Sequence, residues 1–431
     1  MKHILSIIFT VIITDFYFFP IEFVFLPGVN TKMVLAGFSL ILLGFNLAKG
    51  QTGKMDKGFF WLSLAALGVS LASYISIVIN NTFDYSFTGY IISMWVWLGG
   101  AYTVIETIKR VHGKCSVPLV CDYLIAVCVA QCVIAYVMSL YTPMRDFVDS
   151  ILGGEAFMSK TEGRMYGIGA ALDVAGLRFA AVLVMNAYML ANAKRYFGWY
   201  IIAFLIISVV GNMISRTTTM GIGIAVIYWI YAARKSNWKI SGSKLWVIAT
   251  CAVIFIGGVI YLYNADYSFR KNLRFGFEGF FSLAETGEWE VHSNEILTEH
   301  MIVFPKTLDT WIIGDGYCAN PLDEIFRDPY YTGPNYHGYY MATDIGYIRF
   351  IFYFGLIGLV AFVSFFIVCG KVCVTKFSKY KVLFVLLLLV NFIGWCKVAT
   401  DIFLVFAPFL CIGREESDAA EERTALNEVV R

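Results

Sequence analysis

Charged residues are scarce in this sequence of 431 residues, and their scarcity decides the class of protein. Asp, Glu, Lys and Arg make up 15% of the chain, whereas soluble domains carry roughly 25%. Hydrophobic residues account for 59% and aromatic residues for 17%. A water-soluble surface cannot be built from that mixture, so the composition predicts an integral membrane protein surrounded by a lipid bilayer.

A strong excess of basic residues is also absent. The formal net charge is only +2, and proteins that bind nucleic acid normally carry a marked positive excess. Gly167 and Gly169 are too isolated to form a nucleotide-binding loop. We therefore expect neither a nucleic-acid partner nor a nucleotide cofactor.

The ten cysteines indicate neither disulfides nor a metal site. Cys318 alone lies in a long polar segment, where a single thiol cannot form an internal disulfide. Cys121, Cys128 and Cys132 share one face of a helix, but no His or carboxylate is placed to complete a metal site with them. No carboxylate pair is positioned to hold a cation either. We predict a protein that acts without a metal or other cofactor.

Apolar stretches long enough to cross a membrane recur along the chain, since a helix needs about 20 apolar residues to cross the hydrocarbon core. The predicted crossings are 4–26, 33–48, 59–80, 88–108, 117–141, 171–192, 197–214, 217–233, 245–263, 345–370, 381–396 and 398–413. The sequence therefore predicts an all-α polytopic membrane protein with about twelve transmembrane helices.

The first and last of these stretches carry charges. The stretch 4–26 contains Asp15 and Glu22 and lacks a small-residue cleavage site, unlike a signal peptide, so we expect a retained first helix with both carboxylates on one face. Lys397 and Asp401 interrupt the run 381–413 and are four residues apart. On a helix they would neutralise each other, and the number of crossings is then twelve or eleven.

Basic residues occur in every second connection, and short cytoplasmic loops of membrane proteins are rich in Lys and Arg. The basic connections contain Lys49, Lys54, Lys57, Lys109, Arg110, Lys114, Lys194, Arg195, Arg234, Lys235, Lys239, Lys244, Lys371, Lys376, Lys379 and Lys381. The alternate connections carry little positive charge. We expect both termini in the cytoplasm.

Two external segments, 142–170 and 264–344, are too long to be simple turns. The second mixes aromatic, charged, Gly and Pro residues and contains helix-like runs at 293–301 and 323–326, which favours an ordered external cap. The predicted division of the chain is 1–141, 142–170, 171–263, 264–344, 345–413 and a solvated tail at 414–431.

Four arginines lie toward the same external side of the predicted bundle. They are Arg164, Arg178, Arg216 and Arg349. Guanidinium groups suit phosphate or pyrophosphate, because the planar fork donates two parallel hydrogen bonds and stays charged. Alternatively they pair locally, Arg178 with Asp173 and Arg349 with Asp344.

The large external segment also contains candidates for a general base. They are His292, His300, His337 and Asp344. A base must lie within hydrogen-bond reach of the hydroxyl whose proton it accepts. The alternative for each histidine is packing within the loop.

Three parts of the sequence carry a family resemblance. They are TDIGYIR at 343–349 with YFGLIG at 353–358, WIIGDG at 311–316, and the Arg-bearing stretch 163–179. These stretches, and the order of helices and loops over the whole chain, resemble the Wzy-type O-antigen and capsule polysaccharide polymerases, relatives of the O-antigen ligases. The resemblance implies a GT-C-like fold with a large periplasmic loop between helices nine and ten.

The resemblance implies a reaction at the periplasmic face of a bacterial inner membrane. A growing glycan would pass from undecaprenyl pyrophosphate to another lipid-linked repeat unit, with a chain-length regulator and a flippase as partner proteins. The four arginines would bind the pyrophosphate and glycan. Asp344, His292 or His337 would orient or deprotonate the acceptor hydroxyl.

The sequence also departs from the family pattern. Some polymerases have an Arg, ten residues and then a Gly in both loops, whereas eleven residues separate Arg164 from Gly176 here and the large loop has no copy. His292-Ser293-Asn294 is similar to the segment around the catalytic loop histidine of the ligases. An O-antigen ligase and a lipid-linked oligosaccharide flippase or other transporter therefore remain alternatives.

Overall fold

The protein is mostly helical and has several helices that can cross a membrane. The computed structural model describes residues 2–50, 57–152, 164–192, 196–236, 242–320 and 339–413. Within these ranges eight helices are long and apolar enough to span a bilayer. They are α2 (Thr31–Ala48), α3 (Lys57–Asn80), α4 (Tyr90–His112), α5 (Val117–Leu140), α8 (Leu172–Asn192), α9 (Phe197–Ile214), α11 (Gly242–Ala265) and α16 (Gly346–Lys376). The chain is therefore a multi-pass membrane protein.

Each of the twelve predicted crossings contains a helix. The four beyond the spanning set are α1 (Lys2–Phe18), α10 (Thr218–Ser236), α17 (Lys381–Gly394) and α18 (Phe403–Cys411). Three of these four are shorter than the 18 residues of the shortest spanning helices. Short helices cross a bilayer only where neighbouring protein covers their ends.

The prediction of one helix through 4–26 is wrong. α1 ends at Phe18, because Pro20 has no N–H to continue the helical hydrogen bonds. An antiparallel hairpin of β1 (Glu22–Phe23) and β2 (Leu26–Asn30) follows, so the chain is not entirely α-helical. Glu22 accepts a hydrogen bond from the Gly28 N–H (2.8 Å) and does not share a helix face with Asp15.

The prediction of a continuous helix through 398–413 is also wrong. α18 has nine residues, which span only about 14 Å at 1.5 Å per residue. The segment before it is not helical, because side chains bind its backbone: Trp395 donates to the Thr400 carbonyl (2.6 Å) and Asn391 accepts from the Ile402 N–H (3.2 Å). The predicted pair of Lys397 and Asp401 on one helix face therefore does not form.

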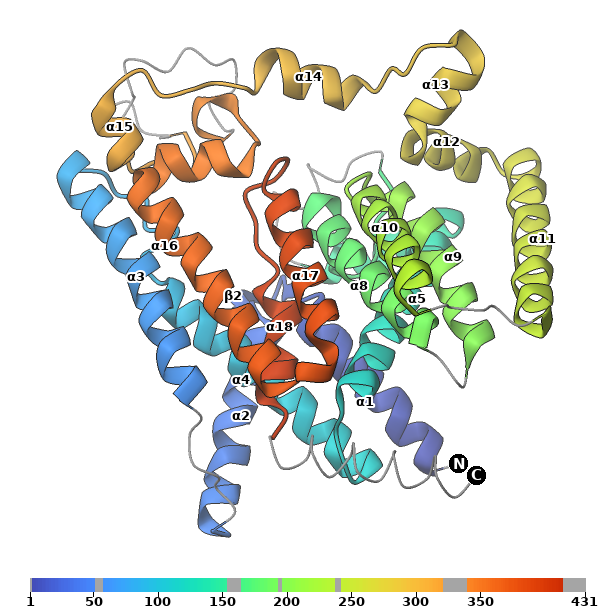
Figure 1. Cartoon of the computed structure of the whole chain (residues 1–431), viewed down its shortest axis with the longest axis horizontal. Helices are drawn as coiled ribbons and strands as arrows, with labels where there is room; N and C mark the ends of the chain where they lie inside the picture. Colours follow the sequence, from blue (N-terminus) through green and yellow to red (C-terminus); the bar gives the residue numbers. More distant parts are fainter. Residues whose placement is uncertain are drawn as a thin grey trace.

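The long helices lie side by side, and a row of short helices covers one end of them (Figure 1). This row consists of α12 (Tyr267–Gly276), α13 (Glu278–Thr286), α14 (His292–His300) and α15 (Leu308–Ile312). It runs from α11 across the top of Figure 1 to α3 and α16. α14 confirms the predicted helical run at 293–301, whereas the run at 323–326 lies outside the described residues.

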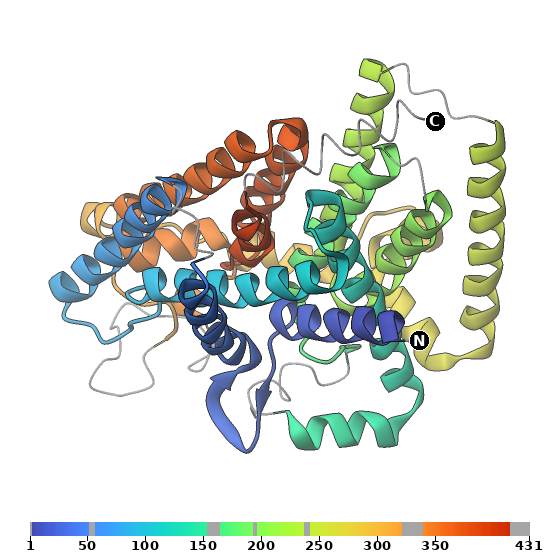
Figure 2. The ribbon, with the colours of Figure 1, turned by 90° about the horizontal axis from the view of Figure 1, so that it is seen from below.

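One short helix and two single helical turns connect the longer helices, and one spanning helix stands at the edge of the bundle. α6 (Thr142–Ile151) follows α5, and the Val24 N–H of the hairpin donates to its Ile151 carbonyl (2.9 Å). The single turns η2 (Tyr340–Ala342) and η3 (Ser378–Tyr380) flank α16. α11 stands at the edge of the molecule in both views (Figures 1 and 2), where it contacts α9, and no residue of its most apolar stretch is buried.

The row of short helices is fastened to α16 at a break in that helix. Phe354 and Gly355 have non-helical backbone angles, and Gly355 has φ 65°. The break leaves backbone carbonyls of α16 without helical partners. The Asp315 N–H donates to the Phe352 carbonyl (2.6 Å), and the Gly316 N–H donates to the Tyr353 carbonyl (3.1 Å). Two of the stretches that carry the family resemblance, 311–316 and 353–358, thus bind each other.

Candidate functional site

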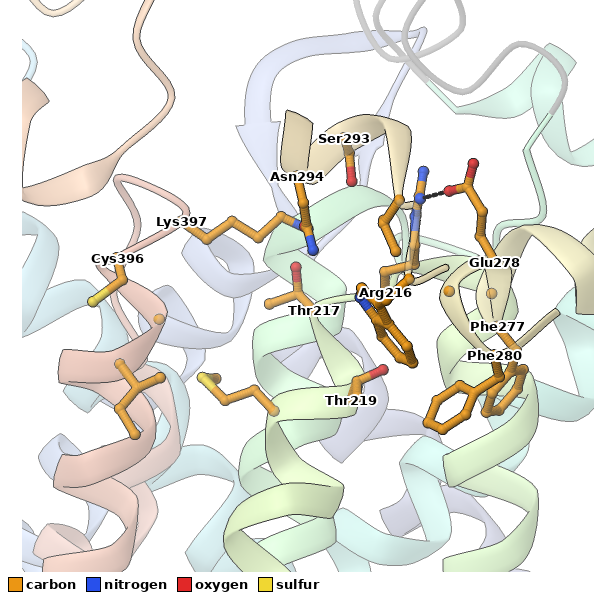
Figure 3. A pocket seen from close by; sticks show the side chains of 17 residues that line it. Arg216, Thr217, Thr219, Phe277, Glu278, Phe280, Ser293, Asn294, Cys396 and Lys397 are labelled. Carbon is orange, nitrogen blue, oxygen red and sulfur yellow. Dashed lines mark hydrogen bonds and ion pairs between the residues drawn. The ribbon is translucent and has the colours of Figure 1, made fainter. Parts of the chain in front are cut away.

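A cavity of about 320 Å³ lies under the row of short helices. It is enclosed by the first turn of α10, by α13 with the start of α14, and by the end of α17 (Figure 3). Its polar side chains include Arg216, Thr217, Thr219, Glu278, Asn294 and Lys397. Phe277, Phe280 and Trp289 form an aromatic wall. Cations, hydroxyls, an amide and aromatic rings therefore line one space.

Arg216 lies in the tight turn between α9 and α10, as the sequence predicts, and it faces the cavity. Its guanidinium forms an ion pair with Glu278 of α13 (Figure 3). The same guanidinium lies 4.4 Å from the centre of the Phe275 ring, and that of Arg164 lies 5.5 Å from it. One aromatic ring thus brings together two of the four predicted arginines.

Lys397 supplies the second cation of the cavity. Its side chain extends from the end of α17 toward Asn294 of α14 (Figure 3), and its Nζ lies 3.5 Å from Oδ1 of Asp173. Asp173 also accepts hydrogen bonds from the hydroxyls of Ser215 (2.8 Å) and Thr217 (2.5 Å). Asp173 therefore joins α8, the α9–α10 turn and the end of α17. The alternative in which Asp173 pairs with Arg178 does not occur.

Arg178 is buried beneath this site and contacts α1. Its Nη1 donates to the carbonyl of Phe18 (2.6 Å), and its guanidinium lies 5.5 Å from the centre of the Phe19 ring. Its Nε has no hydrogen-bond partner among the described residues. Arg178 does not line the cavity, so the structure does not bring it together with Arg216.

Arg349 lies in the first turn of α16 and is 8% exposed. Its Nη2 donates to the Cys318 carbonyl (3.1 Å), and its guanidinium lies 3.7 Å from the centre of the Tyr339 ring. Its Nη1 is 3.9 Å from Oδ1 of Asp344, so the local pair predicted from the sequence is present. Its Nε has no hydrogen-bond partner in the described part of the chain.

Arg349 and its neighbour Tyr339 lie close to the ion pair of Lys397 and Asp173. Burial, and then the nearby carboxylates of Asp344 and Asp173, raise the pKa of Tyr339, although Arg349 opposes that effect. The N–H of Tyr347 donates to the carbonyl of Trp395 (3.1 Å), which holds the start of α16 against the end of α17. Arg349 and Lys397 therefore lie at adjacent ends of two packed helices.

The two described histidines that were proposed as bases, His292 and His300, are exposed and do not line the cavity. The side chain of His292 is 76% exposed, and its Nδ1 lies 3.8 Å from Glu295. His292 does not line the cavity, whereas the next two residues, Ser293 and Asn294, do. The side chain of His300 is also exposed. His337 lies outside the described residues.

Glu278 and Lys397 are the two charged groups of the cavity that sequence reasoning missed as site residues. Glu278 is a lone carboxylate in the aromatic stretch 275–281, and that isolation was the signal available. Lys397 is a lone cation in an apolar run, and Asp401 is the acid nearest to it in the sequence. The sequence therefore pointed to Asp401 as its partner, whereas the structure pairs it with Asp173.

The cavity has the chemistry of an anion and sugar site. Each of its cations has one carboxylate partner, so a bound anion would compete with a carboxylate, and Glu278 is the more exposed of the two. The hydroxyls and the amide suit sugar hydroxyls, and the aromatic wall suits the apolar faces of sugar rings. In the described ranges no cluster of three or more His, Cys, Asp or Glu could hold a metal ion.

Comparison with known proteins adds no family assignment. No protein-family model, curated protein or solved structure matches the chain. The case for an activity therefore rests on the cavity and the charged groups around it.

Proposed function

We propose that this chain is a membrane glycosyltransferase that joins undecaprenyl-pyrophosphate-linked oligosaccharide repeat units into O-antigen, capsular or other surface polysaccharide. The observation that carries the proposal is the cavity at one end of the helices, where Arg216 and Lys397 face an aromatic wall. Cations bind the pyrophosphate of such a donor, and aromatic and amide side chains bind its sugars. A lipid-linked donor also requires a site next to the bilayer.

The chemistry needs no nucleotide sugar, because the anomeric carbon of the donor already carries its leaving group. The acceptor hydroxyl oxygen bonds to that carbon, the bond from the carbon to the pyrophosphate oxygen breaks, and undecaprenyl pyrophosphate leaves. Arg216, Lys397 and Arg349 stabilise the negative charge that develops on the leaving group. The hydroxyl proton passes to a carboxylate, with Asp344 and Glu278 as the candidates.

The proposal includes an orientation. The cavity faces the periplasm, both termini lie in the cytoplasm, and the membrane is a bacterial inner membrane. In support, the basic ends of α4 and α16, at Lys109, Arg110 and Lys376, lie at the helix ends opposite the row of short helices (Figure 1). Twelve crossings and a GT-C-like fold, with a chain-length regulator and a flippase as partners, belong to the same proposal.

The experiment that tests the function is glycan chain length in a strain deleted for this gene. The strain is complemented with wild type, Arg216→Ala, Arg349→Ala or the control Arg145→Ala, which removes a partly exposed arginine of α6. We expect Arg216→Ala and Arg349→Ala to shorten the polymer ladder while single repeat units still reach the acceptor. Loss of one charge-stabilising donor typically lowers kcat on the order of 10²-fold.

The outcomes separate the alternatives. If single repeat units also disappear from the surface in the deleted strain, the chain acts as a ligase or a flippase. If both variants give the wild-type ladder, the cavity is not the site of polymerisation.

A further inference from the structure

A second hollow lies at the opposite end of the molecule from the cavity. It is a groove of about 510 Å³ between the start of α3 and the end of α16, lined mainly by apolar atoms. Both helix ends lie in the lower half of Figure 1, whereas the row of short helices lies at the top. The groove is therefore on the face where the basic residues gather.

One face of each helix forms the walls. On α16 the lining residues Val368, Lys371, Val372 and Thr375 are spaced three and four apart, so they share one helix face. On α3 the first residue, Lys57, and Trp61 are four apart and share a face in the same way. Each wall therefore presents a lysine beside apolar surface.

Two lysines of the groove, Lys57 and Lys371, have no acidic partner among the described residues. Lys57 and Lys371 are exposed, and no ion pair involves either of them in the described ranges. Lys376, the third lysine of the lining, donates from its Nζ to the carbonyl of Leu410 (2.7 Å), which fixes its ammonium at the groove. Three cations thus surround one apolar groove.

We propose that this groove binds one anionic phospholipid, with its phosphate at Lys57 and Lys371 and an acyl chain against Trp61 and Val368. A phospholipid fits because the walls belong to membrane-spanning helices and combine charge with apolar surface. Trp61 is 57% exposed, and tryptophans gather at the membrane–water interface. Uncompensated lysines at that interface select negatively charged headgroups over zwitterionic ones. This inference does not depend on the proposed glycosyl transfer.

The test uses the full chain in phosphatidylcholine nanodiscs that contain a trace of photoreactive phosphatidylglycerol. Labelled peptides are identified by mass spectrometry, and unlabelled lipid is added as competitor. We expect labelling at Trp61 and at residues 368–375, with phosphatidylglycerol competing at far lower concentration than phosphatidylcholine. That comparison uses only the wild-type protein, so it does not depend on any variant being folded.

Variants test the role of the two lysines. Lys57→Gln/Lys371→Gln is expected to weaken phosphatidylglycerol competition roughly 25-fold, or about fivefold for each basic side chain near an anionic surface. The matched control Arg234→Gln/Lys235→Gln removes two charges from the end of α10, outside the groove. We expect the control to compete like wild type.

Three results would overturn the proposal. Equal loss in both double variants would mean a general attraction of anionic lipid to a basic face. Equal competition by phosphatidylcholine would mean that the groove does not select charge. A photoreactive residue placed at Thr375 that labels the acidic segment 414–431 in place of lipid would mean that the chain itself occupies the groove.

Discussion

Asp173, in the first turn of α8, lies 3.5 Å from the Nζ of Lys397 at the end of α17, so an ion pair joins two helices far apart in the sequence. The side chains are 28% and 30% exposed, which places the pair in a partly water-excluded environment. Asp173 also accepts two hydroxyl hydrogen bonds, which hold its carboxylate in place independently of Lys397. Lys397 is thereby directed into the cavity.

Removal of either charge of this pair is expected to destabilise the protein, and removal of both to cost less than the sum. A double-mutant cycle with Asp173→Asn and Lys397→Met should give a coupling free energy of about 0.5–3 kcal/mol, measured by thermal unfolding in detergent. Lys381→Met, at the other end of α17, is the matched control. Strict additivity of the two effects would show that the pair does not form.

Glu278→Gln is expected to strengthen anion binding in the cavity. The carboxylate of Glu278 pairs with Arg216 and competes with any phosphate for the same guanidinium. The amide keeps the size of the side chain but removes its charge, so inorganic pyrophosphate should bind roughly fivefold more tightly, which corresponds to about 1 kcal/mol. Binding is measured by calorimetry on the purified protein.

The control for this prediction is Glu285→Gln, which removes an exposed carboxylate from the same helix outside the cavity. It should leave pyrophosphate binding unchanged. Weaker binding in Glu278→Gln would mean that the carboxylate orients Arg216 for the ligand, and equal tightening in both variants would mean that only the overall charge matters.

Helix positions were predictable from the sequence because the apolar runs are long and the bilayer fixes their length. The hairpin at 22–30 was hidden, since its Phe, Val and Leu residues continue the apolar run of α1; Pro20 and the Pro27-Gly28 turn were the contrary signals. The non-helical segment before α18 was hidden for a similar reason. Its backbone is satisfied by side chains that only the folded protein brings close.

The site was predictable in part. The position of Arg216 in a turn between two helices followed from the alternation of apolar runs, and the structure places it at the cavity. The inward direction of Arg178, toward Phe18, depends on how α8 packs against α1, and one sequence carries no such information. The pairing of Lys397 with Asp173 is equally non-local.

The contact between α12 and α13 is expected to weaken in acid. Two hydrogen bonds of 2.7 Å from the Arg274 guanidinium lower the pKa of Glu285 below its ordinary value of 4.5. A carboxylate whose pKa is lower in the folded protein stabilises the fold above its unfolded pKa and loses that effect as the pH falls through the folded value. Protease cleavage at residues 287–291 should therefore stay slow at pH 7 and accelerate below pH 4.5.

Arg274→Gln checks the cause of this pH dependence. Without the guanidinium the pKa of Glu285 returns toward its ordinary value, so cleavage should already be faster at pH 7 and should change less between pH 7 and pH 4. If the variant shows the same acceleration in acid as wild type, another carboxylate is responsible.

Gly355→Ala is expected to detach the row of short helices from α16. Gly355 has φ 65° and ψ −171°, a region essentially confined to glycine where an L side chain costs on the order of 1–3 kcal/mol, and a Cβ there would meet the backbone of Ile312. Gly258→Ala in α11 is the matched control, because a Cβ at Gly258 meets nothing within 4 Å and alanine favours a helix interior. Hydrogen exchange should rise at 311–316 in Gly355→Ala and stay at the wild-type level in Gly258→Ala. Unchanged exchange in both would mean that the bonds from Asp315 and Gly316 to α16 do not hold the row in place.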